Sequence, residues 1–373
     1  MQASPVPGDC VAVLSVREAV SQSTGRFPTY CEPREVGCFS MVGEQPCWVD
    51  GAAMLKYLRM PSSPDQLRWD LNRGYETAVR WDLLKGKKIH NLLRWLAYQA
   101  SNPAAEPGPE RPFVQAPPLQ QSLLADTDFV CGRGTLARIA CTPYDKRNDW
   151  RLVACRHRGT IFLCSSLTDA YRQLRLDDKA DPERDRPAYW GYKFEQFMAA
   201  SETSDTDGSS STAGYIELKT LCPERQAHSF HRFKLLRWWA QSFFAGTPQV
   251  ICGFRDKQGI VHFVKEFNVR EMPRDCKGLW SDAVCLNFTD QVLSFIKRHV
   301  NEDNPEEFYV FQYVPSSDKV VCTHLTEPGE FAFMPTWYLE PHDAKQRVSR
   351  HGEPSVRLCD KCNVDVALHS DLQ

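Results

Sequence analysis

Residues 215–219 read Tyr-Ile-Glu-Leu-Lys, a run that predicts a β-strand. Side chains two apart on a strand point to the same face, so Glu217 and Lys219 should emerge side by side. A carboxylate can ligate a hard cation such as Mg²⁺, the Leu218 carbonyl could add a ligand, and an ammonium can stabilise phosphate charge. This combination is typical of metal-dependent phosphodiester cleavage. The same spacing also occurs as a solvated charge pair on an exposed sheet face, and both interpretations stay open.

Downstream of this strand, residues 230–244 predict a strongly apolar helix that Gly246 closes. One face of the helix is apolar and is predicted to be core. A second face carries Lys234, Arg237 and Gln241. This face could line a path for phosphates with a polar glutamine at its end, or it could be an ordinary solvated face.

Two upstream stretches offer further polar groups. Residues 191–195 read Gly-Tyr-Lys-Phe-Glu, where apolar neighbours would anchor Glu195 against a core as a second metal ligand. The alternative is an acidic residue in the first turn of a helix, where it is electrostatically favoured. In the run Cys-Gly-Arg-Gly at 131–134, the glycines would let the backbone and Arg133 approach an anion closely, unless the run is only a turn.

The composition excludes a protein that attracts nucleic acid through a high overall positive charge. Of the 373 residues 25% are charged, and 45 Lys+Arg against 47 Asp+Glu give a formal charge of −2. No global positive field attracts nucleic acid, so any phosphate-binding surface must be local. The longest uncharged stretch, residues 238–254, is interrupted by Gln241, Gly246 and Pro248. We therefore expect no membrane span, and the N-terminal sequence predicts no secretory leader.

The cysteines predict free thiols in a reducing compartment. There are 15, an odd number, scattered singly along the chain. Cys359 and Cys362 form the one close pair. No second pair lies nearby, so this pair indicates neither a zinc site nor a redox site.

Predicted helices and strands alternate along the chain, but they do not form the repeated strand–helix–strand units of a parallel sheet. Helices are predicted over residues 88–99, 230–244 and 283–300. Strand pairs are predicted at 150–154 with 159–164, 250–254 with 260–264, and 309–314 with 320–324. The pattern predicts an α+β protein with mixed or antiparallel sheets.

The predicted domain organisation has three parts. Residues 1–25 should be a flexible N-terminus, residues 26–341 one folded domain, and residues 342–373 a polar C-terminal tail. Within the domain, about residues 102–118 should form a Pro-rich surface loop, and residues 201–214 a flexible polar loop.

Six motifs, in this order, resemble the decapping exoribonuclease (DXO) family. They are CGRGTL at 131–136, TPY at 142–144, RGTI at 158–161, GYKFEQ at 191–196, YIELKT at 215–220 and KLLRWWAQSF at 234–243. Residues 37–40 and 331–338 extend the likeness over 26–341. The resemblance implies a single domain of two mixed, twisted β-sheets surrounded by helices. It also implies a metal-dependent nuclease site in a cleft between the sheets.

The resemblance assigns metal ligands. Glu195 and Glu217 would be ligating carboxylates, with the Leu218 carbonyl beside them. The implied cofactor is Mg²⁺ or Mn²⁺, with two ions in the intact family site.

The resemblance also assigns catalytic and substrate-binding residues. The catalytic set would be Glu217, Lys219 and Gln241, of which Lys219 and Gln241 hold the scissile phosphate and the water. The residues implied to bind substrate are Gly132, Arg133, Gly134, Lys219 and Gln241.

The chain departs from the family at one place. Family members carry another acidic motif, Glu-apolar-Asp on a strand, between the GYKFE and ELK motifs. Here only 22 positions separate Glu195 from Glu217, and the acids between them lie in the polar segment 201–208. Losing two carboxylates weakens a two-metal site, because both ions need fixed ligands. The chain is therefore either a shortened form or a relative drifting away from catalysis.

Together these features predict a metal-dependent hydrolase that acts on RNA 5′ ends. By resemblance, it would release pyrophosphate from 5′-triphosphate RNA, remove incomplete or NAD-type caps and degrade RNA 5′→3′, with activity impaired by the missing motif. The alternative is a catalytically dead member that binds RNA 5′ ends or a partner 5′→3′ exoribonuclease. A DNA nuclease would fit the strand but not the flanking motifs. The resemblance further implies a nuclear protein, with the cytoplasm left open, and we expect a monomer without membrane contact.

Overall fold

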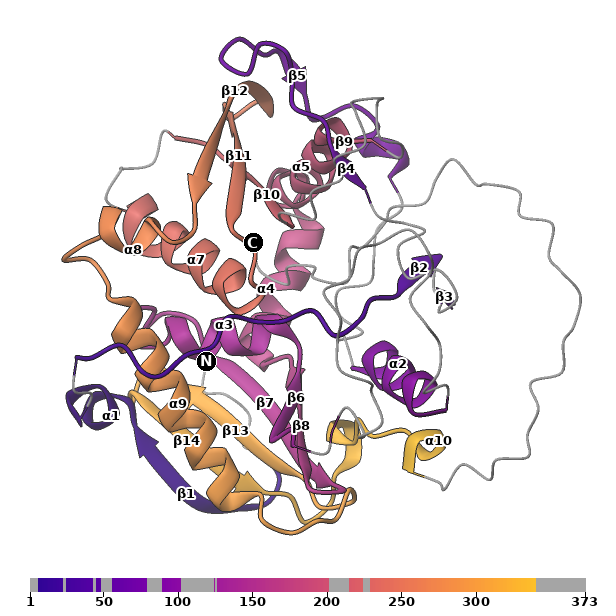
Figure 1. Cartoon of the computed structure of the whole chain (residues 1–373), viewed down its shortest axis with the longest axis vertical. Helices are drawn as coiled ribbons and strands as arrows, with labels where there is room; N and C mark the ends of the chain where they lie inside the picture. Colours follow the sequence, from indigo (N-terminus) through magenta and orange to yellow (C-terminus); the bar gives the residue numbers. More distant parts are fainter. Residues whose placement is uncertain are drawn as a thin grey trace, which may run out of the picture.

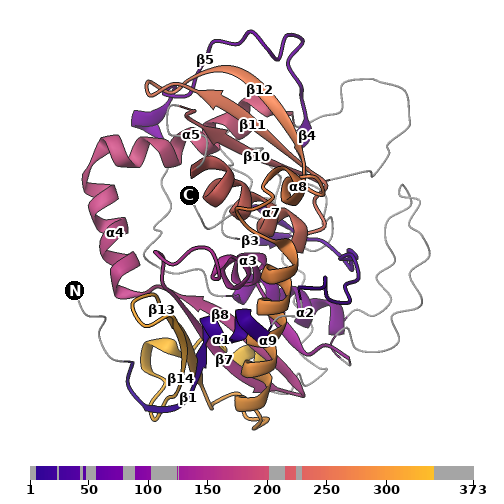
Figure 2. The same cartoon turned by 90° about the vertical axis from the view of Figure 1, so that its left-hand side faces the viewer.

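Two β-sheets, one above the other in Figure 1, organise the chain. The computed structural model describes residues 6–22, 25–42, 45–47, 56–78, 89–101, 124, 126–200, 215–223 and 229–339. Helices α3 and α7 lie between the two sheets, α9 crosses the lower sheet, and α5 lies beside the upper one (Figures 1 and 2).

The larger sheet has six strands in the order β1-β14-β13-β7-β8-β6. Strands β6 and β8 are parallel, and the other neighbours are antiparallel. Its strands are β1 (Asp9–Ser15), β6 (Phe129–Cys131), β7 (Trp150–His157), β8 (Thr160–Ser166), β13 (Tyr309–Val314) and β14 (Lys319–His324).

The smaller sheet has four strands in the order β10-β11-β12-β5, with β10 parallel to β11 and the other pairs antiparallel. Its strands are β5 (Trp69–Asp70), β10 (Ile216–Leu221), β11 (Gln249–Arg255) and β12 (Ile260–Asn268). Two short ribbons are separate from both sheets: β2 (Ser40–Val42) with β3 (Gln45–Cys47), and β4 (Tyr57–Leu58) with β9 (Ala199–Ala200).

The helices carry the apolar faces that cover these sheets. The α-helices are α1 (Val16–Gln22), α2 (His90–Ser101), α3 (Arg133–Cys141), α4 (Asp169–Ala180), α5 (Pro182–Met198), α7 (Leu235–Phe244), α8 (Met272–Asp275), α9 (Asp282–His299) and α10 (Thr336–Leu339). Short turns of other helix types are η1 (Tyr75–Thr77), η3 (Phe230–Lys234) and η4 (Gly329–Phe331).

The core consists of separate clusters, one for each covered sheet face. On the larger sheet, α9 buries Phe288 and Val292 against strands β7, β8, β13 and β14. On the smaller sheet, one face is covered by α7, including Trp238 and Trp239, and the other face by α5. The smaller sheet is therefore enclosed on both sides, and its α7 side faces the larger sheet.

The predicted fold class is confirmed: the structure is α+β with two mixed sheets and helices around them. The predicted strand pairs form β7 with β8, β11 with β12, and β13 with β14. The three predicted helices correspond to α2, η3 with α7, and α9. Gly246 follows α7 with φ 68°, as a helix-closing glycine should.

The expected flexible N-terminus is wrong over residues 9–22. Strand β1 pairs along β14, and Val16 and Ala19 of α1 are buried against α9. The register of the pairing shifts between Cys10 and Ala12, which interrupts the alternation of buried and exposed residues. The sequence pattern therefore does not predict this strand. The N-terminal segment is thus an edge of the larger sheet.

Several predictions fall outside the described residues. These are the loops at 102–118 and 201–214 and the tail at 342–373 with Cys359 and Cys362. The cysteines whose side chains are described are free thiols, as predicted. Among the described helices, none has the length and apolar character to cross a membrane.

Candidate active site

Strand β10 places Glu217 and Lys219 on one face of the smaller sheet. In the parallel register with β11, Glu217 lies opposite Val250 and Lys219 opposite Cys252, and both partners are buried in the core under α7. The two side chains meet as predicted, with Lys219 Nζ 2.7 Å from Glu217 Oε1. Each side chain is only 12% exposed. The alternative of a solvated charge pair on an exposed face is therefore wrong.

Arg133 reaches the same carboxylate from the larger sheet. Strand β6 ends at Cys131, Gly132 stands before the first turn of α3, and Arg133 begins that helix. Its Nη1 lies 2.8 Å from Glu217 Oε2, and its side chain is 8% exposed. A Cβ atom added at Gly132 or Gly134 would meet nothing within 4 Å, so the space around this turn is open.

Gln241 completes the cluster from α7. It is 2% exposed, and its Oε1 accepts a hydrogen bond from Lys219 Nζ at 3.0 Å. Lys219 is thus held between an acidic and an amide oxygen. The four side chains of Arg133, Glu217, Lys219 and Gln241 form one hydrogen-bonded chain between the two sheets.

The charges in this cluster set the protonation of Glu217. Burial alone would raise the pKa of its carboxyl, but the positive charges of Lys219 and Arg133, with their hydrogen bonds, lower it below the ordinary value of 4.5. Glu217 is therefore ionised at neutral pH, as a metal ligand must be.

Helix α5 contacts β10 and covers the sheet face opposite to that of Glu217 and Lys219. Glu195 lies in the last turn of α5, so the alternative that placed it in a first turn is wrong. The preceding Phe194 is fully buried against the smaller sheet. A Cβ atom at Gly253 of β11 would lie 2.5 Å from the Phe194 ring, so only glycine lets the helix lie this close. The structure thus anchors Glu195 through its apolar neighbour, as the sequence predicts.

An ion pair that no sequence pattern indicates holds α7 in place. Arg237 donates a hydrogen bond to Asp145, which follows α3, and the Asp145 side chain is 9% exposed. Asn148 donates to both oxygens of Asp145. Arg237 precedes Gln241 by one helical turn, so Asp145 anchors the helix that presents Gln241. No spacing along the chain signals this contact, because 92 positions separate its partners.

The described residues do not form a complete metal cage. Within them, no group of three or more His, Cys, Asp or Glu side chains could hold a metal ion. The acids of segment 201–208 lie outside the described part of the chain. Strand β10 is at one edge of the described sheet, so alternate peptide carbonyls of this strand point away from β11.

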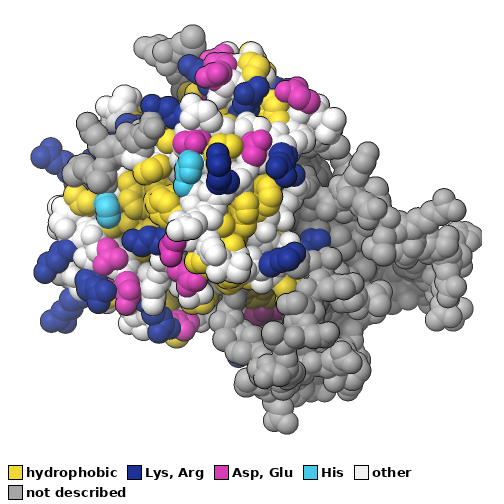
Figure 3. Space-filling view, turned by 90° about the horizontal axis from the view of Figure 1, so that it is seen from above, with side chains coloured by type: hydrophobic (Ala, Val, Ile, Leu, Met, Phe, Trp, Pro, Cys, Tyr) yellow, Lys and Arg dark blue, Asp and Glu magenta, His cyan; other side chains and the backbone are white. Residues whose placement is uncertain are grey.

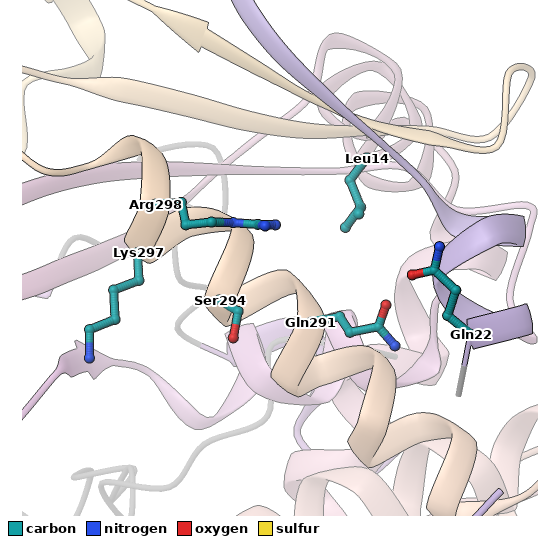
Figure 4. Close-up of a pocket in the computed structure, with 6 residues that line it drawn as sticks. All are labelled: Leu14, Gln22, Gln291, Ser294, Lys297 and Arg298. Carbon is teal, nitrogen blue, oxygen red and sulfur yellow. The ribbon is translucent and has the colours of Figure 1, made fainter. Parts of the chain in front are cut away.

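One surface pocket lies away from these residues. It has a volume of about 700 Å³, and its lining includes Leu14, Gln291 and Arg298. Figure 4 shows it between β1, α1 and α9, with Arg298 pointing towards Leu14. None of the predicted site residues lines it.

Comparison with known proteins identifies the family. The family described as RAI1 like PD-(D/E)XK nuclease matches residues 31–213 and 202–339. The chain belongs to this family. The mouse protein named Decapping and exoribonuclease protein is 31% identical over 375 residues, which cover 88% of this chain and 90% of the mouse protein. The predicted resemblance is therefore confirmed.

Solved structures of RAI1-like nucleases share the fold. Candida albicans Rai1, in complex with pU5-Mn²⁺, has a TM-score of 0.65 at 17% identity and covers 91% of this chain and 98% of its own. Scheffersomyces stipitis Rai1, in complex with (3′-NADP)⁺ and calcium, has a TM-score of 0.64 at 18% identity and covers 80% and 90%. The sequence Glu217-Leu218-Lys219 fits the (D/E)XK pattern that the family description prints.

Proposed function

We propose that this chain is a divalent-metal-dependent decapping nuclease that acts on RNA 5′ ends. Its reactions would be release of pyrophosphate from 5′-triphosphate RNA, removal of incomplete or NAD-type caps, and 5′→3′ degradation of RNA. The observation that carries the proposal is the chain of hydrogen bonds from Arg133 through Glu217 and Lys219 to Gln241. Relatives named as decapping nucleases supply the substrate class.

The donors near β10 fit a hard, hydrated cation. Mg²⁺ usually keeps several waters and binds through one or two carboxylates and substrate phosphates. The proposed ligands are Glu217, Glu195 and the Leu218 carbonyl. These donors would hold one ion, and a second ion would need acids outside the described residues. When bound, such a cation polarises phosphoryl oxygens and lowers the pKa of its water.

The protein's own groups have distinct proposed roles. Arg133 has a planar guanidinium suited to two phosphate oxygens, so it would orient the 5′ phosphates of the RNA. Lys219 would donate to the scissile phosphate and stabilise the negative charge that grows on it. Gln241 would hold Lys219 in position and orient the attacking water. Gly132 and Gly134 would leave the room that the phosphates need.

A second candidate is a binding protein without turnover. It is favoured by one observation: the described residues bring no group of three acidic, His or Cys ligands together. Arg133 and Lys219 would still bind RNA 5′ ends, and a 5′→3′ exoribonuclease could act on the held RNA. Such binding would weaken with salt, because phosphate contacts release counterions.

We further propose a monomeric protein with a single catalytic domain over residues 26–341, to which β1 and α1 add an edge. The proposed location is the nucleus, and the proposed partners are RNA 5′ ends and an exoribonuclease. The (3′-NADP)⁺ and pU5 ligands of the fungal Rai1 structures support an RNA end or a dinucleotide as substrate.

The test is an assay of the full chain on 5′-triphosphate and NAD-capped RNA with Mg²⁺ or Mn²⁺. Wild-type protein should release pyrophosphate or the nicotinamide nucleotide. Lys219→Ala should lower the rate about 100-fold, as loss of one transition-state donor does. Lys277→Ala, at an exposed lysine of the segment after α8, is the matched control. Activity that survives Lys219→Ala overturns the mechanism, and binding without turnover supports the second candidate.

A further inference from the structure

Strand β1 leaves one edge of the larger sheet open. It pairs with β14 along one side, and none of the described strands pairs with its other side. Figures 1 and 2 show β1 at the lower end of the molecule. A free strand edge presents unpaired N–H and C=O groups, to which another strand can bind.

The peptide groups of Val13 face this open edge. The Val16 N–H donates to the Asp318 carbonyl at 3.0 Å, and the pairing with β14 is regular from Ala12 onward. In an antiparallel pair every second residue bonds to the partner strand, so Ala12 and Leu14 bond to β14 as Val16 does. Val13 lies between them and therefore directs its N–H and C=O away from β14.

The regular part of β1 lacks the charges that keep sheet edges from pairing. Natural edges usually carry charged side chains, above all lysine, or proline. The strand reads Asp-Cys-Val-Ala-Val-Leu-Ser, and its one charged residue, Asp9, lies before the bulge between Cys10 and Ala12. Val11 and Val13 are both 48% exposed. An edge of this composition is suited to binding another strand.

The outer edge of β12, in the smaller sheet, is closed in the way that the edge of β1 is not. Beyond its pairing with β5, the Leu67 N–H donates to the His262 carbonyl, and the Val264 N–H donates to the Pro64 carbonyl. The strand then continues into exposed Lys265. Figure 3 looks down on this end of the molecule and shows Lys, Arg, Asp and Glu side chains among the hydrophobic ones.

A surface pocket with basic walls lies beside β1, on the α9 face of the sheet. It has a volume of about 700 Å³, and Figure 4 shows Gln291 and Arg298 of α9 directed to the space beside Leu14. The two charged residues of its lining, Lys297 and Arg298, are both basic. Lys297 Nζ lies 2.6 Å from Asp128 Oδ1, whereas Arg298 is exposed and has no ion pair with a described residue. The pocket thus offers one free guanidinium to an acidic side chain.

We propose that the outer edge of β1 binds an extended segment of a partner protein in which apolar and acidic residues alternate. The segment adds a strand to the larger sheet, with its backbone bonded to Val13. Neighbouring residues on paired strands point to the same face. The residues beside Val11 and Val13 are therefore apolar, and a residue beside Leu14 extends its carboxylate into the pocket, where Arg298 binds it.

An acidic segment fits this edge better than a second copy of the chain does. Two β1 strands side by side would bring apolar residues together, but the one acid of the strand, Asp9, lies beyond the bulge, so neither Arg298 would gain an acid. A nucleic acid would find one free cation here and no row of them. No residue of the edge or the pocket belongs to the proposed catalytic set, so binding here is independent of the proposed function.

The test is a titration of the full chain with fluorescently labelled peptides of seven residues, the length of β1, followed by anisotropy. One peptide alternates valine and glutamate, and the other alternates valine and lysine. Wild type should bind the glutamate peptide about tenfold more tightly, because only its side chains pair with Arg298. Amide exchange gives a second readout on wild type. Bound glutamate peptide should slow the exchange of the Val13 N–H about tenfold.

Two substitutions separate the edge from the charge. Val13→Pro removes an N–H that does not bond to β14, a position where an edge strand tolerates proline, and should weaken binding of the glutamate peptide about tenfold. Val13→Thr keeps the N–H and should bind as wild type does. Arg298→Gln should weaken binding about fivefold at low salt and have no effect at about 1 M salt. The control is Arg184→Gln, at a side chain that is 58% exposed on α5.

Three results would each overturn the proposal. They are equal affinity of wild type for the two peptides, exchange of the Val13 N–H that the glutamate peptide does not slow, and a folded Val13→Pro variant that binds as wild type does. Light scattering covers the remaining occupant of the edge. A wild-type dimer that Val13→Pro dissociates would assign the edge to a second copy and overturn the peptide site, whereas a wild-type monomer supports it.

Discussion

Arg133 Nη1 lies 2.8 Å from Glu217 Oε2, although 84 positions separate the two residues in the chain. Arg133 starts α3 directly after the larger sheet, whereas Glu217 lies on the smaller sheet. This ion pair therefore joins the two sheets at the candidate site. Charge-assisted contacts of this kind are strong when they are shielded from water, and here the side chains are 8% and 12% exposed.

Replacing Arg133 by alanine should weaken binding of the RNA 5′ end more than it slows the chemistry. In the proposed complex the guanidinium contacts phosphates of the substrate, so KM for 5′-triphosphate RNA should rise about tenfold. Glu217 would also lose a partner, which should lower the free energy of unfolding by about 1–3 kcal/mol. Steady-state kinetics and urea unfolding measure the two effects. Arg270→Ala, at a side chain that is 76% exposed, is the control. An unchanged KM contradicts the assignment.

Replacing Gly253 by alanine should move the end of α5. The new Cβ atom would lie 2.5 Å from the Phe194 ring, so the helix must shift and carry Glu195 with it. Overpacking of this kind costs about 1–3 kcal/mol of stability. The affinity for Mn²⁺, measured by calorimetry, should fall together with stability.

A matched change separates crowding from the general effect of a Gly→Ala substitution. At Gly134 a Cβ atom meets nothing within 4 Å, so Gly134→Ala should leave the free energy of unfolding unchanged or raise it by about 0.4–1 kcal/mol. If Gly253→Ala and wild type had the same free energy of unfolding, the Phe194 ring would not pack tightly against Gly253 and would not fix the position of α5.

The pair of Asp145 and Arg237 should make stability depend on pH. Burial raises the pKa of Asp145, but the charge and hydrogen bond of Arg237 outweigh it and hold the pKa below the ordinary value of 3.8. A carboxyl whose pKa is lowered by folding contributes stability that is present above its unfolded pKa and is lost as pH falls through its folded pKa. Wild type should therefore exceed Asp145→Asn in stability at neutral pH, and the gap should narrow below about pH 4.

The measurement is the urea midpoint of both proteins in a series of buffers. The control is Asp275→Asn, because the Asp275 side chain lies beside Arg274 but is 53% exposed. Because Asp145 positions α7 without touching substrate, Asp145→Asn should lower kcat and leave KM unchanged. If the difference in urea midpoint between wild type and Asp145→Asn stays constant down to acid pH, the ionised carboxylate of Asp145 is not the cause of that difference.

Local rules predict the parts of this site that are close in sequence. Alternation on a strand places Glu217 beside Lys219. Helical spacing identifies the buried apolar face of α7 with Trp238 and Trp239, but it does not predict that Gln241 is buried as well. Contacts between residues far apart in the sequence have no local pattern that predicts them. Arg133 meets Glu217, and Phe194 meets Gly253, only because the two sheets and α5 assemble in three dimensions.

The same distinction explains the misplaced N-terminus. Strand β1 pairs with β14 at the far end of the chain, and its bulge breaks the period of two. Val11 and Val13 are both 48% exposed, whereas Ala12 and Leu14 pack against the core. Both faces of the strand are therefore apolar, and the sequence shows no alternation of polar and apolar residues. The family resemblance correctly predicts the two sheets, because it draws on the order of motifs and not on local periodicity.

The most direct test of the account is metal-dependent pyrophosphate release from 5′-triphosphate RNA by wild type and Glu217→Gln. The substitution keeps the shape of the side chain and removes the charge that would hold a cation. Glu330→Gln, at a side chain that is 72% exposed, is the control. Wild type should gain activity with added Mn²⁺ until it saturates and lose it with chelator. Glu217→Gln should remain about 100-fold slower at saturating Mn²⁺. A wild-type rate that ignores the metal, or a Glu217→Gln rate equal to wild type, would contradict the account.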